Sequence, residues 1–262
     1  MKKVIALIVS AILLMTCLAA CGSSGVSLAQ VQKAGKLSIA TSPDFPPFES
    51  LGDSGKVEGI EIDILNLICE KLGVKLEINQ MDFDSVLPAI QAGKFNVGVS
   101  GISVTPKREK NVLFTTPYCL AAQAIVVLKD SPITCKADLT DKKIAVQTGT
   151  TAETYCMENK YEISSFAANS DAQTALLTGK VDAWVIDDLT AAEMVKAYNE
   201  ANGDHLVILS EALTTEPYAF AFSFGSETLV EEINKIIKKL LADGTIAEIF
   251  AKYEAPYTAP TN

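Results

Sequence analysis

Few side chains in this sequence could carry catalytic or metal chemistry. His205 is the only histidine among 262 residues, so a multi-histidine metal site is excluded and a Ser–His–Asp triad would depend on that one residue. The sequence contains no Cys-x-x-Cys pair of the kind used in metal and redox sites. We therefore expect no metal, no cofactor and no catalytic residue, and the remaining candidates are residues that bind a ligand.

Three segments have residue types that suit an anion. Arg108 could form a bidentate pair with a carboxylate, although on the residues alone a solvated place in the helix that begins at Thr105-Pro106 is favoured. Ser100-Gly101 follows the strand expected at residues 95–99, and open α/β sheets bind ligands beyond such strand ends. Thr150-Thr151 begins a helix, whose first N–H groups favour negative charge.

The N-terminus has the features of a secretion signal. Lys2 and Lys3 precede an apolar run at residues 4–20, which ends in Leu-Ala-Ala-Cys21. This ending resembles a bacterial lipobox, which would make Cys21 the lipidated first residue after removal of the signal peptide, residues 1–20. A flexible tether would follow at residues 21–35. The alternative is a short N-terminal membrane anchor.

The composition is that of an acidic globular protein. With a formal net charge of −10 and 48% hydrophobic residues, the chain is not disordered and we expect it to bind no nucleic acid. After the signal, Cys69, Cys119, Cys135 and Cys156 remain. Four cysteines allow three pairings that the sequence does not distinguish, and Cys69 is expected on the apolar side of a helix.

Strand and helix patterns alternate along the chain. Strands are expected at residues 37–41, 75–78, 95–99, 143–147, 181–186 and 218–224, and helices at 63–72, 84–92, 151–158, 172–177, 189–201, 229–241 and 245–253. The alternation predicts two α/β units in series, each with a mostly parallel sheet. A cleft between two such units is a preferred site for a small molecule.

Four groups of segments, in order, resemble the substrate-binding lipoproteins of polar amino-acid ABC importers. They are residues 41–49 (TSPDFPPFE), 59–64 (GIEIDI), 100–108 (SGISVTPKR) with 114–118 (FTTPY), and 147–151 (QTGTT) with 179–182 (GKVD) and Asp187. The resemblance runs from about residue 36 to residue 255. Single motifs of this kind are unspecific, whereas the ordered set is specific.

The resemblance implies an α/β, two-lobed, periplasmic-binding-protein-like type II fold with a ligand cleft between the lobes. The first lobe would be discontinuous, formed by residues 36–120 and 220–262, and the second lobe would be residues 121–219. Hinges would lie near residues 120–124 and 218–221.

The resemblance also implies how a free amino acid would be held at its charged end. Arg108 would bind the α-carboxylate, and Asp187 would bind the α-ammonium. Asp187 could instead cap the helix that follows it, a role that Asp188 can take as well. The remaining contacts near the charged groups would come from Ser100, Gly101, Ser103, Thr150 and Thr151.

The rest of the ligand would lie between Phe45 and Phe83, although each could be an ordinary core residue, and Phe48 is expected in loop packing. Positions that meet the ligand side chain in relatives hold Ser42, Gln147 and Ile186 here. None of these is charged, which predicts a polar, uncharged side chain. Asp44 or Glu49 could still supply a charge, so a basic ligand remains the alternative.

The predicted function is extracytoplasmic binding of a free amino acid by hinge closure and its delivery to an ABC permease with a cytoplasmic ATPase. The chain would be a monomer, held at the outer face of the membrane by the lipid on Cys21. Two alternatives remain open. One is a ligand sensor for a separate signalling partner, and the other is a dehydratase-like enzyme on the same fold, with Glu49 or Glu153 as its acid.

Overall fold

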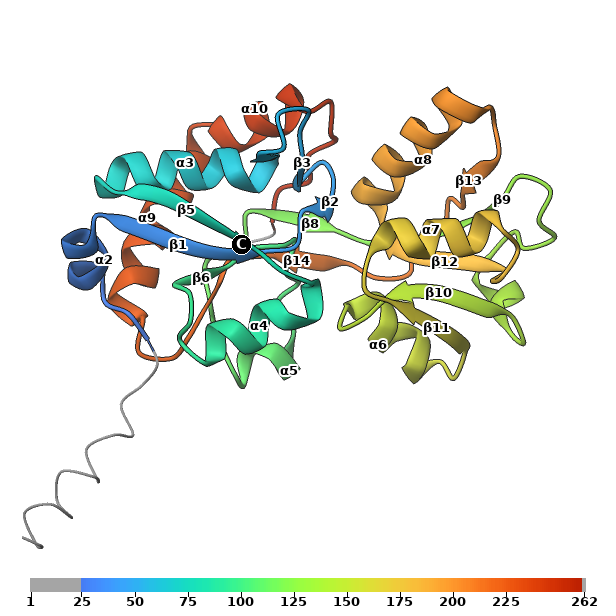
Figure 1. Ribbon diagram of the computed structural model, residues 1–262, viewed down its shortest axis with the longest axis horizontal. Helices are drawn as coiled ribbons and strands as arrows, with labels where there is room; N and C mark the ends of the chain where they lie inside the picture. The colour runs from blue at the N-terminus through green and yellow to red at the C-terminus, as the bar shows by residue number, and fades with distance from the viewer. Residues whose placement is uncertain (1–24, 261–262) are drawn as a thin grey trace, which may run out of the picture.

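The computed structural model describes residues 25–260, which form two α/β bodies lying side by side (Figure 1). The predicted signal peptide and the lipidation at Cys21 lie outside the described residues. Within 25–260, no helix is both long and apolar enough to cross a bilayer.

The first body contains a five-stranded sheet whose strands come from both ends of the described chain. In order across the sheet these are β5 (Lys75–Gln80), β1 (Lys36–Thr41), β6 (Val97–Gly98), β15 (Ala221–Phe222) and β7 (Leu113–Phe114). Its helices are α2 (Leu28–Ala34), α3 (Ile60–Leu72), α4 (Phe83–Gln91), α5 (Pro106–Glu109), α9 (Glu227–Ala242) and α10 (Thr245–Lys252). Helices α3, α9 and α10 pack against one another, while α4 packs on β1, β6 and β15 (Figure 1).

The second body contains another five-stranded sheet, formed by one continuous part of the chain. Its strands in order are β11 (Glu162–Phe166), β10 (Lys143–Gln147), β12 (Ala183–Asp187), β9 (Gln123–Leu128) and β13 (Leu206–Ile208). Its helices are the short 3₁₀ helix η1 (Lys136–Leu139), α6 (Thr151–Glu158), α7 (Asn169–Leu177) and α8 (Asp188–Asn202).

The chain crosses between the bodies twice, at neighbouring strands. Strands β8 (Cys119–Ala121) and β14 (Glu216–Tyr218) pair antiparallel with each other, and the strand that follows each crossing enters a five-stranded sheet. These entering strands, β9 and β15, are antiparallel to their neighbours, while the other strands of each sheet run in one direction. The prediction of two mostly parallel sheets is therefore confirmed.

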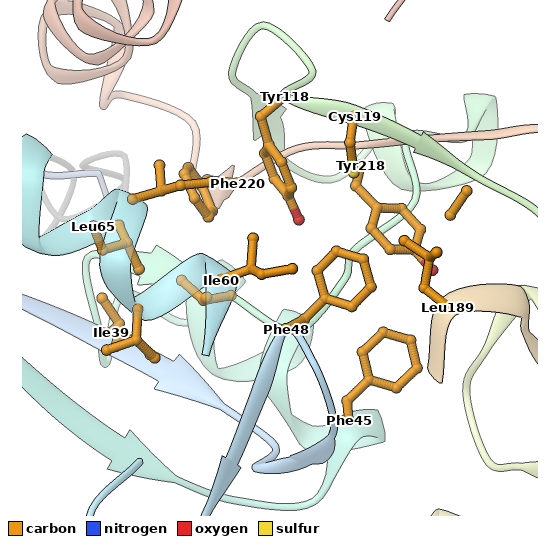
Figure 2. Packing of buried hydrophobic residues seen from close by; sticks show 14 of the residues in the cluster. Ile39, Phe45, Phe48, Ile60, Leu65, Tyr118, Cys119, Leu189, Tyr218 and Phe220 are labelled. Carbon is orange, nitrogen blue, oxygen red and sulfur yellow. The ribbon is translucent and has the colours of Figure 1, made fainter. Parts of the chain in front are cut away.

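An aromatic cluster connects the first body to the crossing strands. A small sheet of β2 (Asp44–Phe45), β3 (Glu49–Leu51) and β4 (Val57–Glu58) carries Phe48 in the turn between its first two strands. The Phe48 ring is wholly buried, and its centroid lies 5.5 Å from that of Phe45 and 5.2 Å from that of Tyr218 (Figure 2). The centroid of the Phe250 ring lies 6.0 Å from that of Phe48. Packing of this kind fixes the loop that carries Phe45, as expected for Phe48.

Three expectations about local structure are corrected. Residues 28–34, assigned to a flexible tether, form helix α2, because Ser27 caps it and Val31 inserts into the core. The single strand expected at 218–224 is two, β14 and β15, because the chain changes sheets between them. The strand expected at 95–99 has only the two paired residues of β6.

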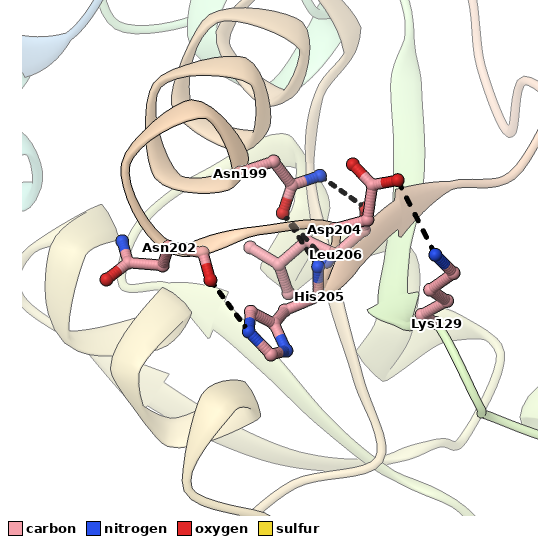
Figure 3. Close-up of polar contacts among 6 residues, drawn as sticks. All are labelled: Lys129, Asn199, Asn202, Asp204, His205 and Leu206. Carbon is pink, nitrogen blue, oxygen red and sulfur yellow. Dashed lines mark hydrogen bonds and ion pairs between the residues drawn. The ribbon is translucent and has the colours of Figure 1, made fainter.

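Within residues 25–260, neither a cysteine nor the histidine lines the cleft described below. Cys69, Cys119 and Cys156 are buried free thiols, as expected for Cys69, and Cys135 is a partly buried free thiol. His205 is exposed near the start of β13, where its Nε2 atom lies 3.0 Å from the Asn202 carbonyl oxygen (Figure 3).

Candidate ligand-binding site

Ten of the eleven residues predicted to bind the ligand line one small cleft between the two bodies. They are Phe45, Phe83, Ser100, Gly101, Ser103, Arg108, Gln147, Thr150, Thr151 and Asp187, and Asp44 joins them. Ser42, the eleventh, is buried behind Asp44 and donates a hydrogen bond to it (2.9 Å). Ile186 is also buried but does not line the cleft.

Arg108 extends into this cleft from the short helix α5. Thr105 caps the helix by accepting the Arg108 N–H (3.2 Å). The guanidinium donates to two backbone carbonyls, Ser103 in the first body (3.0 Å) and Gly149 in the second (3.2 Å), and lies 5.7 Å from the Phe83 ring centroid. None of the ion pairs among residues 25–260 involves Arg108. Its positive charge is therefore available for a carboxylate.

Asp187 is buried at the end of β12. One carboxylate oxygen accepts hydrogen bonds from Tyr218 Oη and from Gln123 Nε2 (2.9 Å). The pKa of Asp187 is raised to about 8, mainly by burial and next by the nearby charge of Glu216, although these two hydrogen bonds lower it. An ammonium group would stabilise the ionised form, so this carboxyl suits the α-ammonium of a ligand.

The Asp187 side chain does not act as a helix cap, which was the alternative role considered for it. Asp187 occupies the N-cap position of α8, but its side chain makes no capping hydrogen bond. Asp188 instead accepts the Leu189 N–H (2.9 Å) and also the Ala122 N–H (3.2 Å) of the crossing segment. Asp188 therefore satisfies the helix terminus, which leaves the Asp187 carboxylate directed at the cleft.

Glu216, which sequence reasoning missed, connects both sides of the site. Its Oε2 atom accepts from Ser103 Oγ of the first body (2.5 Å) and Thr151 Oγ1 of the second (2.7 Å), and its Oε1 atom accepts from Thr214 Oγ1 (2.8 Å). Glu216 lies two residues before the strand expected at 218–224. An acidic residue beside a predicted hinge was the only signal available in the sequence.

Ser100 and Gly101 form the floor of the cleft next to Phe45. Gly101 has φ +52°, and a Cβ atom there would lie 2.3 Å from a Phe45 ring carbon. A side chain at this position would therefore displace the aromatic ring. Ser100 Oγ accepts the Ser42 N–H (3.2 Å) and donates to Glu49 Oε1 (2.6 Å).

Gln147, Asp44 and Asn169 form a polar network across the cleft. Asp44 Oδ2 accepts from Gln147 Nε2 (3.1 Å) and from the Asn169 N–H at the start of α7 (2.8 Å). The Asn169 side chain in turn donates to Gln147 Oε1 (3.0 Å). Thr150 has a different task, because its hydroxyl caps α6 by accepting the Glu153 N–H (3.1 Å).

The cleft is closed in this structure. Its free volume is about 10 Å³, which is on the scale of one water molecule. A larger groove with a volume of about 570 Å³ adjoins the cleft and is lined in part by Phe83, Arg108, Gly149 and Thr151. An amino acid cannot enter the closed cleft unless the two bodies separate. Among residues 25–260 there is no cluster of side chains suited to a metal ion.

Comparisons with known proteins identify the class to which this chain belongs. The model of the family described as bacterial extracellular solute-binding proteins, family 3, matches residues 37–256. The chain therefore belongs to this family, and its two-lobed α/β fold is the type II periplasmic-binding fold.

Three relatives illustrate the similarity. The chain is 31% identical over 252 residues to a probable histidine-binding protein of Neisseria gonorrhoeae, and the match covers 91% of each sequence. It is 30% identical over 258 residues to the arginine-binding extracellular protein ArtP of Bacillus subtilis, and the match covers 97% of this chain and 98% of the relative. An ancestral arginine-binding protein bound to arginine has a TM-score of 0.78 and 38% identity, with 84% of this chain and 98% of that chain covered.

Proposed function

We propose that this protein binds a free amino acid between its two lobes, with the α-carboxylate on Arg108 and the α-ammonium on Asp187. The role is extracytoplasmic amino-acid binding for an ABC importer, as the family and the named functions of the relatives support. The two charged ends of the ligand would then be paired by opposite charges in a site without bulk water, which is the condition for burying them.

The ligand is a basic amino acid, and arginine is the first candidate. The observation that supports this choice is Asp44. The cleft lining has two carboxylates, Asp44 and Asp187, against one guanidinium, Arg108. Glu216 is held by the hydroxyls of Ser103 and Thr151, and its charge acts on Arg108 and Asp187. Once the α-carboxylate and α-ammonium are paired at that end of the cleft, Asp44 is the carboxylate that is left for the ligand side chain. Our expectation of an uncharged side chain fits the three relatives named above, a probable histidine-binding protein and two arginine-binding proteins, less well than the basic alternative does.

Binding proceeds by hinge closure about β8 and β14. The first lobe would comprise residues 36–120 and 220–262, and the second residues 121–219. Arg108 and Ser103 belong to the first lobe and would hold the ligand before closure. Asp187 and Thr151 would contact the ligand when the second lobe closes, which agrees with the small free volume of the closed cleft.

The protein is exported, in keeping with its family, and we propose that it is a monomer held to the membrane by a lipid on Cys21. The ABC permease would receive the ligand from the closed form. The protein would change no covalent bond of the ligand, which makes it neither a dehydratase nor another enzyme. Recovery of the bound amino acid with unchanged mass after prolonged incubation would test this point.

A thermal-shift series tests the ligand. The purified protein would be mixed with arginine, lysine, histidine, glutamine or cystine, each over a range of concentrations. A ligand at 100 times its Kd adds about 2.7 kcal/mol, or roughly 5–10 °C in Tm for a chain of this size. We expect the largest shift with arginine at equal concentration.

The matched variant is Asp44→Asn, which keeps the size of the side chain and removes its charge. Arginine affinity should fall about tenfold, because a charged hydrogen bond is worth roughly 1.5 kcal/mol more than a neutral one, while glutamine affinity should change less than threefold. A wild-type preference for glutamine, or an equal loss for both ligands, would contradict the basic-ligand assignment.

A further inference from the structure

Two wholly buried carboxyl groups lie directly behind the floor of the cleft. Glu49 comes from β3 and Glu61 from α3, and neither has solvent exposure. Glu49 Oε1 accepts from Ser100 Oγ (2.6 Å), and Glu61 Oε2 accepts from the Gly101 N–H (2.9 Å). Each carboxyl therefore holds one of the two floor residues.

The hydrogen bonds assign different protonation states to the two groups. Both oxygens of Glu61 accept, because Tyr118 Oη donates to Oε1 (2.6 Å), and this pattern fits a carboxylate. Glu49 Oε2 is buried and has no hydrogen-bond partner among the described residues. Glu61 lies beside Glu49, because the Glu61 N–H donates to the Phe48 carbonyl (3.1 Å) and the two carboxyls hold the adjacent residues Ser100 and Gly101. Two wholly buried neighbouring carboxyl groups do not both ionise, so one of them keeps a proton.

We propose that Glu49 is a carboxylic acid that shares its proton with Glu61, and that this pair positions Ser100 and Gly101 for ligand binding. The shared proton stands on the buried geometry alone, whereas its effect on binding rests on the proposed function. Burial is the main cause that raises the pKa of Glu49 well above its usual value, followed by the charge of Glu61.

The surroundings of the pair do not favour a second negative charge. Asp44 on β2 raises the pKa of Glu49 further, and the Ser100 hydroxyl lowers it. On the other side, Tyr118 and Cys119 face Glu61, and burial and the Glu61 charge raise the pKa of both. These neighbours are acids or neutral groups, so loss of the shared proton would leave two carboxylates in repulsion.

Unfolding as a function of pH tests the shared proton without any ligand. In the wild type, folding keeps a proton on Glu49 that the unfolded chain releases near pH 4.5, so the folded-to-unfolded ratio falls as pH rises toward the raised pKa. Glu49→Gln cannot release a proton. We therefore compare the folded-to-unfolded ratio of Glu49→Gln with that of the wild type by urea unfolding from pH 5 to 7. For each pH unit, the ratio of the variant should rise up to about tenfold relative to that of the wild type, or roughly 1.4 kcal/mol.

The matched control is Glu58→Gln on the neighbouring strand β4, where the glutamate is exposed. Its stability should follow that of the wild type across the same pH range. An infrared difference between the wild type and Glu49→Gln at pH 7 should also contain the band of a protonated carboxylic acid. Parallel pH profiles for Glu49→Gln and the wild type, or absence of that band, would overturn the shared proton.

Binding of arginine tests the positioning role. Glu49→Ala removes the acceptor of Ser100, and Glu61→Gln places amide hydrogens against the donors of Gly101 or Tyr118. Each should weaken arginine binding by more than tenfold, while Glu58→Gln stays within twofold of the wild type. Unchanged affinity in folded Glu61→Gln would overturn the positioning role. If the wild type binds no arginine but the pH result holds, the proposed ligand fails and the shared proton stands.

Discussion

Ligand affinity should depend on pH through Asp187. This carboxyl has a pKa of about 8 in the closed, unliganded site because it is buried, with the Glu216 charge as the second cause. The ammonium of the ligand pairs with the ionised form, so binding at lower pH must first remove a proton. The folded protein therefore binds more tightly as pH rises toward 8, and the gain is lost as pH falls.

The magnitude follows from the fraction of Asp187 that is ionised before binding. With a pKa of about 8, roughly 1% of the carboxyl is ionised at pH 6 and about 25% at pH 7.5. The apparent Kd should therefore fall about 25-fold between these values, which is roughly 1.9 kcal/mol, while the bound ammonium keeps Asp187 ionised in the complex.

Isothermal titration calorimetry is the assay, with arginine as the ligand and two buffers that differ in ionisation enthalpy. At pH 7, close to one proton should be released for each arginine bound. Glu216→Gln should flatten the dependence on pH, because it removes the charge that helps to raise the pKa of Asp187. A wild-type Kd that changes less than twofold between pH 6 and 7.5, or an unchanged slope in Asp187→Asn, would refute the reasoning.

Three further substitutions test the site and the core. Arg108→Lys replaces a planar fork with a point charge, so the Kd for arginine measured by calorimetry should rise about 10- to 100-fold, and an unchanged Kd would remove Arg108 from the site. Gly101→Ala combines a φ of +52° with a Cβ atom 2.3 Å from Phe45, so urea unfolding should show a loss of about 1–3 kcal/mol. Phe48→Ala removes a wholly buried ring and should cost about 3–5 kcal/mol in the same assay. A loss below about 1 kcal/mol in either variant would contradict the packing described for it.

Amphipathic helices were predictable because their signal is local. The apolar stripe that predicted a helix at 229–241 recurs every three or four residues, and Leu229, Ile233 and Ile237 are all wholly buried in α9. Helix α3 ends as expected at Gly73, which has φ +71°. The spacing of apolar residues along such a helix depends on one side being buried, and it is the same whichever elements the helix packs against.

Strand boundaries were less predictable because pairing involves distant residues. Residues 218–224 read as one apolar strand, yet Tyr218 pairs with Cys119 and Ala221 pairs with Gly98 in another sheet. Strand β9 is buried over most of its length, and such a run has no alternation to distinguish a strand from a buried helix. Only the partners assign these segments to a sheet.

The amino-acid sequence alone determined the α/β class, the presence of two α/β units and, through ordered motifs, the family and the segments that line the cleft. The tertiary structure decided which side chains meet. Glu216 joins Ser103 across 113 positions, and Glu49 meets Ser100 across 51. The physical reason is that periodicity and motifs are local, whereas burial, protonation and hydrogen bonding depend on neighbours that folding brings together from distant parts of the chain.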